Sequence, residues 1–387
     1  MNILVINYEY PPIGGGGGVL CKDISEGIAA KGHRITVVTS HYGSLQESEQ
    51  LHGVNIFRVP VLMRKKQTVA SMASMLSFVP MCIRKAMELM ERDRYDLINT
   101  HFAIPSGPAG HYLSRKYRIP NVLTILGGDI IDPSKFLSPH NTFLLNQTVR
   151  KMLFGADRVV AESTDIKRNA QEYYGFDRQV DIVPLGIYPN THPEKSRDAL
   201  GLPSDRFIFV TIGRLVKRKN LEDLLHIFKD VQETIPSILL VIGDGPEKDN
   251  IESLSKQLGI EKTVRLMGRV SDEEKFQYLT ASDVYLSTAI HEGFGIVFLE
   301  AMECGLPVLS YDRGGQTDFL REGKTGHLIA LGNKGDFAEK LKGLLHSEPA
   351  RTEIRDHNRK YVKEFYIEHV AERYIAIFNE VASSREI

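Results

Sequence analysis

The stretch FIFVTIGRLVKRKN, residues 207–220, decides the fold that we expect for this chain of 387 residues. It opens with the apolar run Phe207–Ile212, turns at Gly213 and then carries four cations within six residues. An apolar run without alternation is typical of a parallel strand that is covered on both faces. A glycine turn directly after such a strand usually leads into the helix of a βαβ unit. The stretch therefore predicts the first strand of a doubly wound α/β domain.

The same alternation of apolar runs and helical stretches extends through the whole chain. Strands are predicted at residues 3–7, 34–40, 54–59, 97–100, 121–126, 158–161 and 180–183, and then at 207–212, 239–243, 264–267, 284–287 and 307–310. A segment rich in proline and turn formers, 183–193, separates the two sets, which makes it the expected linker. We therefore expect an α/β protein of two doubly wound, Rossmann-like domains, 1–187 and 188–365, that face each other across a cleft. Ligands of such sheets bind at the carboxyl ends of the strands.

Composition and charge disfavour several classes of protein. The 48 Lys and Arg nearly balance the 49 Asp and Glu, whereas nucleic-acid binders are usually basic, so we expect no nucleic-acid partner. The three cysteines, Cys21, Cys82 and Cys304, are far apart and lack a C-x-x-C pair, which disfavours a disulfide scaffold or a zinc site. The first residues are typical of a strand and not of a signal peptide, and no uncharged run reaches the roughly 20 apolar residues of a membrane span. We expect a cytoplasmic protein.

Five consecutive glycines, Gly14–Gly18, follow the first predicted strand and the pair Pro11-Pro12. Glycine loses more conformational entropy on folding than other residues, so five in a row require more than a tight turn. The backbone N–H groups of Gly15, Gly16 and Gly17 can approach an anionic group closely, and the helix N-terminus that follows favours negative charge. We therefore favour a binding loop over a merely flexible one. It is neither a dinucleotide fingerprint nor a P-loop, because the second strand has no acidic end and no Gly-Lys-Ser/Thr follows.

Cations also gather where the strand 207–212 ends. Arg214 can form two parallel hydrogen bonds with a diphosphate, and Lys219 can add a point charge. The helix N-terminus that follows Gly213 favours anions as well. We favour phosphate binding here over a solvated basic loop. Gly243, in a Gly-Asp-Gly-Pro turn after the next strand, would allow a ligand to approach the backbone.

The segment HEGFGIVFLE, residues 291–300, places Glu292 and Glu300 eight residues apart. If a helix begins near Gly295, Glu292 lies in the preceding loop and Glu300 about a turn and a half inside the helix. The N–H groups of residues 293–295 would then meet an anion. Carboxylates beside a phosphate site suit sugar hydroxyls, because they repel the phosphate itself.

Taken together, these residues resemble the retaining glycosyltransferases of group 1, glycosyltransferase family 4, which have the GT-B fold. The resemblance spans nearly the whole chain. Its strongest element is Glu292 to Glu300, which is similar to the E-x7-E motif of the family, with Gly293-Phe294-Gly295 in between. Four weaker elements accompany it: the N-terminal glycine loop, Gly213-Arg214-Leu215 with Lys219, Gly243-Asp244-Gly245-Pro246, and Cys304-Gly305-Leu306-Pro307-Val308.

The resemblance implies that the second domain binds a nucleoside diphosphate sugar, with a UDP-sugar favoured, and that the first domain binds the acceptor. Arg214 and Lys219 would neutralise the diphosphate, and Glu300 would accept hydrogen bonds from the ribose. Glu292 would lie near the donor sugar and Arg269-Val270 near the base.

The resemblance further implies retention of the anomeric configuration without a metal or a cofactor. The acceptor would be a glycan, a lipid-linked molecule or a small molecule, in the synthesis of cell-surface polysaccharide or glycolipid. The C-terminal helix, 366–387, would pack back on the first domain. Two other functions stay open: a sugar-nucleotide epimerase or phosphorylase on a related scaffold, and a catalytically silent subunit that binds nucleotide sugars.

One position departs from the family pattern. Many relatives carry a histidine that contacts the donor sugar where this chain has Leu126, in Leu126-Gly127-Gly128-Asp129. Leucine can neither donate nor accept a hydrogen bond. Either another group such as His101 or Asp129 takes over this role, or the donor sugar differs, or activity is lowered.

Residues 64–90 combine basic residues with an apolar helical pattern. Five of the ten methionines lie between residues 72 and 90, and Pro80 is expected to kink or split the helix. The members of the apolar pattern are Val69, Met72, Leu76, Val79 and Ile83. This combination suits a peripheral contact with the inner face of a membrane or a lipid-linked acceptor. The alternative is an ordinary amphipathic helix that covers the first domain. The sequence does not indicate the oligomeric state.

Overall fold

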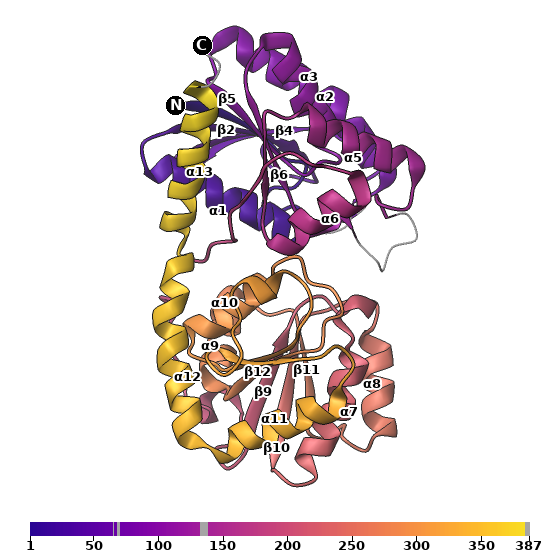
Figure 1. The fold of residues 1–387 in the computed structure, drawn as a ribbon, viewed down its shortest axis with the longest axis vertical. Helices are drawn as coiled ribbons and strands as arrows, with labels where there is room; N and C mark the ends of the chain where they lie inside the picture. Colours follow the sequence, from indigo (N-terminus) through magenta and orange to yellow (C-terminus); the bar gives the residue numbers. More distant parts are fainter. Residues whose placement is uncertain (65, 68–69, 132–137, 384–387) are drawn as a thin grey trace. The chain divides into compact units, whose positions relative to one another are not determined.

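The computed structural model describes residues 1–64, 66, 67, 70–131 and 138–383. The chain divides into two compact units. The first unit consists of Met1–Gly186 together with helix α13 (Ile367–Ser383), and the second unit is Ile187–Tyr366. Each unit is built around a sheet with helices beside it (Figure 1). The predicted fold of two Rossmann-like domains is confirmed.

The sheet of the first unit has eight strands in the order β3-β4-β2-β1-β5-β6-β7-β8. All neighbours pair in parallel except β3 (Ser48–Leu51), which pairs antiparallel with β4. The parallel strands are β1 (Asn2–Ile6), β2 (Arg34–Ser40), β4 (Val54–Val59), β5 (Leu97–His101), β6 (Asn121–Ile125), β7 (Arg158–Ala161) and β8 (Val180–Ile182). The apolar residues of β1 are almost fully buried, as expected for a central strand with helices on both faces.

Helices connect these strands, and α13 packs on the first of them. A Cβ added at Gly27 of α1 would lie 3.1 Å from the Cβ of Ala371, so the small residue at Gly27 allows α1 and α13 to approach closely. The helices of this unit are α1 (Gly16–Ala30), α2 (Met72–Arg92), α3 (Gly107–Tyr117), α4 (Gly127–Ile130), α5 (Phe143–Gly155) and α6 (Thr164–Tyr174).

Helix α2 is continuous through Pro80, so the prediction of a split helix is wrong. Pro80 itself is exposed, whereas Phe78 and Cys82 on either side of it are buried and hold both halves of the helix against the sheet. The face of α2 that enters the core carries Ser74, Phe78, Cys82, Ala86 and Leu89.

The apolar pattern expected in α2 is therefore divided between core and solvent. Val79 and Ile83 pack at the edge of the core, but Met72 and Leu76 are exposed. Val69 lies outside the described residues. None of the described helices is both long and apolar enough to cross a membrane.

The sheet of the second unit has six parallel strands in the order β11-β10-β9-β12-β13-β14. They are β9 (Phe207–Ile212), β10 (Ser237–Ile242), β11 (Val264–Gly268), β12 (Val284–Ser287), β13 (Val308–Tyr311) and β14 (Gly326–Ile329). The helices are α7 (Leu221–Gln232), α8 (Lys248–Gln257), α9 (Asp272–Ala281), α10 (Ile296–Glu303), α11 (Lys334–His346) and α12 (Glu348–Tyr361). The strand order reverses between β9 and β12, and ligands of doubly wound sheets bind at the carboxyl ends of the strands at such a point.

Candidate active site

The loops that follow β9 and β12 meet at the reversal point of the second sheet. The backbone N–H of Ile290 donates to the carbonyl oxygen of Arg218 over 2.9 Å. The hydroxyl of Thr288 donates to the carbonyl oxygen of Asn220 over 2.8 Å. These bonds hold the basic loop, residues 213–220, against the loop that carries Glu292, although the two are about 70 residues apart in the sequence.

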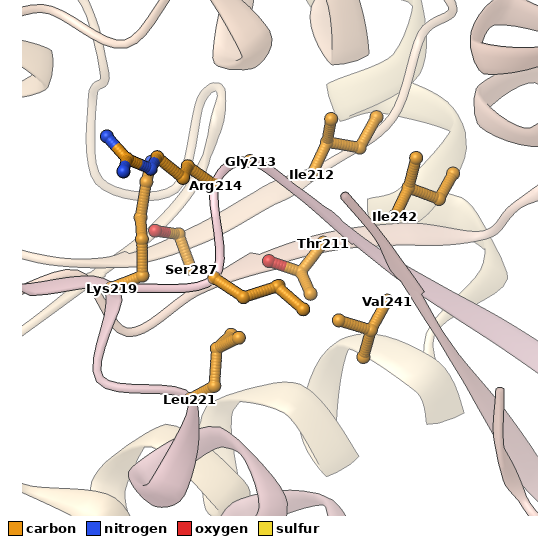
Figure 2. A pocket seen from close by; sticks show the side chains of 10 residues that line it. Thr211, Ile212, Gly213, Arg214, Lys219, Leu221, Val241, Ile242 and Ser287 are labelled. Atoms are coloured by element: carbon orange, nitrogen blue, oxygen red, sulfur yellow. The ribbon is translucent and has the colours of Figure 1, made fainter. Parts of the chain in front are cut away.

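A small pocket lies where β9 ends, and two predicted phosphate-binding residues are among those that line it. Figure 2 shows the side chains of Arg214 and Lys219 beside the turn at Gly213. Arg214 is exposed and forms no ion pair with any residue that the structure describes. The residues that line the pocket are Thr211, Ile212, Gly213, Arg214, Leu215, Lys219, Leu221, Val241, Ile242 and Ser287.

Lys219 differs from Arg214, because its ammonium group forms an ion pair with Glu292. Both side chains are mostly buried, with 13% and 12% of their surface exposed. A guanidinium nitrogen of Arg218 lies 3.8 Å from the other carboxylate oxygen, Oε1 of Glu292. Burial alone would raise the pKa of Glu292, but the two cations outweigh it and hold that pKa below its usual range. Glu292 is therefore a carboxylate at neutral pH.

Glu300 lies inside α10, which begins at Ile296 after an N-cap at Gly295, as the spacing predicts. Its Oε1 accepts a hydrogen bond from Lys275 over 2.7 Å. Its Oε2 is buried and has no partner among the described residues. Burial raises the pKa of Glu300, and Lys275 only partly opposes the shift. Glu300 thus has one buried carboxylate oxygen without a hydrogen-bond partner among the described residues, which is unusual for a buried acceptor.

Two of the glycines predicted to bind the ligand in the second unit are also required by the packing of the chain. Gly243 has a φ of +136°, and a Cβ there would lie 1.9 Å from the carbonyl oxygen of Gly213. Gly295 has a φ of +88°, and a Cβ there would overlap the ring of Phe298. Close packing of the chain on itself therefore accounts for both glycines without a ligand.

Of the other residues predicted to bind the donor in the second unit, some lie in the core and others at the edge of the sheet. Phe294 is buried and its ring lies 4.7 Å from that of Phe319, so it supports the loop from within. Gly293, beside it, is half-buried. Arg269 and Val270 follow β11 at the edge of the sheet, with Arg269 exposed, and β10 separates that strand from β9.

The glycine loop of the first unit already holds an anion of the chain itself. The N–H of Gly15 donates to the carboxylate of Glu9 over 3.1 Å. A Cβ at Gly15 or Gly16 would meet nothing within 4 Å, so a ligand has room there. A Cβ at Gly17 would lie 2.3 Å from the ring of Phe102, so this position must be small for packing reasons.

His101 and Asp129, the two candidates to replace the family histidine, are both buried and bonded within the first unit. His101 is fully buried at the end of β5, its Nε2 lies 2.8 Å from Oδ1 of Asn99, and burial lowers its pKa to about 3. Asp129 accepts the N–H groups of Leu126 and Ala103. Leu126 caps α4 and is 4% exposed. These contacts give both candidates a structural role.

Three residues contact the predicted site residues although the sequence did not predict a role for them: Glu9, Arg218 and Lys275. Arg218 was visible only as one cation of a basic run. Nothing in the sequence relates Lys275 to Glu300 or Glu9 to Gly15, because those contacts arise only when the chain folds. Among the described residues, no three His, Cys, Asp or Glu side chains gather as metal ligands would.

Comparison with known proteins identifies the family. A family model described as "Glycosyl transferases group 1" matches residues 193–361, and one described as "Glycosyltransferase Family 4" matches residues 14–191. This chain belongs to the group 1 glycosyltransferases.

Some relatives of this glycosyltransferase align over almost their full length. N-acetyl-alpha-D-glucosaminyl L-malate synthase of Bacillus anthracis is 26% identical over 96% of this chain and 95% of its own. The structure of sucrose-phosphate synthase from Thermosynechococcus elongatus has a TM-score of 0.86 at 20% identity, covering 99% of this chain and 100% of that one. HepE of Anabaena, solved in complex with UDP, has a TM-score of 0.77 at 20% identity, covering 98% and 100%. These structures share the GT-B fold with the enzyme.

Proposed function

We propose that this enzyme moves a sugar from a UDP-sugar to an acceptor, with retention of configuration and without a metal ion. The observation that carries the proposal is Arg214, an exposed guanidinium with no ion-pair partner among the described residues, beside Lys219 at the reversal point of the sheet. A diphosphate is the ligand that such a pair fits best, because arginine can bind it with two parallel hydrogen bonds. The UDP complex of the similarly folded HepE supports a uridine donor.

The chain's own groups then stabilise the leaving diphosphate. Negative charge builds on this group as the bond between the sugar and the phosphate breaks, and Arg214 and Lys219 are the cations that lie at the proposed diphosphate site. A preorganised donor of this kind is worth about 3 kcal/mol in comparable enzyme sites. The Oε2 of Glu300, which has no partner in the described part of the chain, accepts a hydrogen bond from a ribose hydroxyl on this proposal, while Lys275 holds the other carboxylate oxygen.

The acceptor binds, on this proposal, at the glycine loop of the first unit, where Gly15 and Gly16 leave space beside the backbone. The name of the Bacillus anthracis relative includes malate, which supports small acceptors beside the glycan and lipid-linked ones.

The test is product analysis with UDP-, GDP- and ADP-sugars and a panel of acceptors. We expect UDP release and, by NMR, a product with the anomeric configuration of the donor, in the presence of EDTA. Conversion of the donor sugar without transfer indicates an epimerase, and binding without turnover indicates a silent subunit. Loss of activity in EDTA that Mg²⁺ restores contradicts the metal-free mechanism.

We also propose a peripheral membrane contact through four exposed apolar side chains, which we call the α2 patch: Leu62, Met63, Met72 and Leu76. They are 47–68% exposed. Two hydrogen bonds hold the patch together, from the N–H of Leu62 to Ser77 and from the hydroxyl of Ser71 to the carbonyl of Met63. The exposed cations Lys66 and Arg84 complement an anionic lipid surface.

Flotation with phosphatidylglycerol vesicles at low salt tests this contact. The double variant Met63→Ser with Leu76→Ser should lose binding, because burial of those side chains supplies the affinity. Leu331→Ser, which removes an exposed leucine of the second unit, should bind like the wild type. If the wild-type protein does not float with the vesicles at low salt, the α2 patch does not contact membranes.

A further inference from the structure

Two cations share one buried carboxylate in the basic loop. Lys219 binds Oε2 of Glu292, and Arg218 lies 3.8 Å from Oε1. One cation would be enough to neutralise Glu292 in this state. The presence of the second is therefore the feature that requires an explanation.

Donor binding would give Lys219 a second anionic partner. If Lys219 binds a diphosphate, as proposed above, its ammonium group must give up at least part of its hydrogen bonding to Glu292. An anion that is left without a partner in a buried position is strongly unfavourable. Glu292 would also repel the incoming phosphate. The site therefore needs a second cation that does not move with Lys219.

Arg218 meets this need because it is fixed to the loop of Glu292. Its guanidinium donates to the carbonyl oxygen of His291 over 3.1 Å. Its own carbonyl oxygen accepts the N–H of Ile290 over 2.9 Å. A guanidinium has five N–H donors in a planar fork, so it can keep the bond to His291 while it binds a carboxylate.

We propose that Arg218 is a positioning residue that holds Glu292 in place and charged while the donor diphosphate engages Lys219. This inference rests on the proposed function and adds a residue that no motif of the chain identified. The titratable groups that act on Glu292 are Lys219, Arg218 and His291, which lower its pKa, and Tyr285 lies close enough to interact with it. In this arrangement Arg218 compensates for Lys219 when the donor is bound.

The experiment is titration calorimetry with UDP, in two buffers that differ in their enthalpy of ionisation. The variants are Arg218→Gln and Arg218→Lys, and Lys217→Gln is the matched control that removes one exposed cation from the same turn. We expect Arg218→Gln to weaken UDP binding roughly tenfold. We also expect it to take up additional protons on binding near pH 6, because Glu292 loses its remaining partner and becomes protonated. Proton exchange by UDP itself contributes equally in all variants.

The control and the lysine variant make the result decisive. Lys217→Gln should change affinity less and leave the proton count as in the wild type. Arg218→Lys should fall between wild type and Arg218→Gln, because lysine keeps the charge but lacks the fork. If Arg218→Gln and Lys217→Gln have the same affinity and the same proton uptake, this inference is wrong while the proposed function stands. If the wild type does not bind UDP at all, the proposed function fails first.

Discussion

Arg214 and Lys219 lie on one loop but in different electrostatic surroundings, and this difference determines what each substitution should do. Arg214 is exposed and makes no ion pair with a described residue, so Arg214→Ala should leave the melting temperature unchanged. We expect its kcat/KM to fall about 100-fold, the loss that follows removal of one preorganised donor. Steady-state kinetics and a thermal melt measure both quantities.

Lys217→Ala provides the comparison for Arg214, because it removes a neighbouring exposed cation outside the pocket lining. It should lower kcat/KM by much less. Equal losses in the two variants would mean that general positive charge acts here and that Arg214 has no specific place in the site.

Glu292 predicts a pH dependence of stability. Its pKa in the folded protein is depressed, because Lys219 and Arg218 outweigh the opposite effect of burial. The stability that this gives is present above the unfolded pKa of about 4.3 and is lost as the pH falls through the lower folded pKa. Glu292→Gln should therefore melt below the wild type at pH 7, and the difference should shrink as the pH falls below about 4.3. Thermal melts between neutral and acid pH measure this difference.

Glu261→Gln is the matched control for Glu292, since Glu261 is exposed. It should follow the wild type at every pH. A melting difference for Glu292→Gln that does not vary with pH would assign the effect to packing and not to charge.

Individual residues of the site differ in how far their positions could be predicted from the sequence. The position of Glu292 before α10 and of Glu300 within it followed from a local spacing, because helix geometry relates neighbours in the chain. The pairing of Glu292 with Lys219 did not, since 73 residues separate the two and only the reversal of strand order brings their loops together. His101 was considered for the donor site because it follows the strand predicted at 97–100, but the structure includes it in β5, of which every residue is buried.

At the level of elements, close packing between the loops after β9 and β10 disfavours any side chain at Gly243. Its φ of +136° and the 1.9 Å approach to Gly213 should make Gly243→Ala destabilising by about 2 kcal/mol or more. Gly343 lies inside α11, and a Cβ there would meet nothing within 4 Å. Gly343→Ala should thus stabilise by up to about 1 kcal/mol. Urea unfolding of both variants measures these opposite signs, and destabilisation by Gly343→Ala would contradict the open space found at this position of α11.

The elements that the sequence predicted are those with a strong apolar signal. The buried strands β2, β4, β7, β9 and β12 have the bounds expected from their apolar runs. The edge strand β3 was missed because its residues, Ser48–Leu51, are mostly polar and exposed, so hydrophobicity does not reveal it. Helix α2 was expected to kink or split at Pro80; it does not split, because buried contacts on both sides of the proline outweigh the local preference.

At the scale of the whole molecule, the chain leaves the first unit at Gly186 and returns to it in α13. The residues proposed to bind UDP all lie in the second unit, whereas α13 packs on α1 of the first. Ala371 is fully buried in that contact. Ala371→Arg should therefore destabilise the first unit, because a charge has no place beside Gly27, and leave UDP binding by the second unit intact.

Hydrogen exchange with and without UDP tests whether the second unit binds UDP independently of the α1–α13 contact. In Ala371→Arg we expect faster exchange in α1 and α13, while UDP still protects the loops after β9 and β12 as in the wild type. Ligand at 100 times its Kd adds about 2.7 kcal/mol to the part of the chain that binds it, which is enough to detect in exchange. Asn379→Arg, at an exposed position of the same helix, should exchange like the wild type. If Ala371→Arg also abolishes UDP protection, the two units unfold together, and the second unit does not hold its donor site independently of the C-terminal helix.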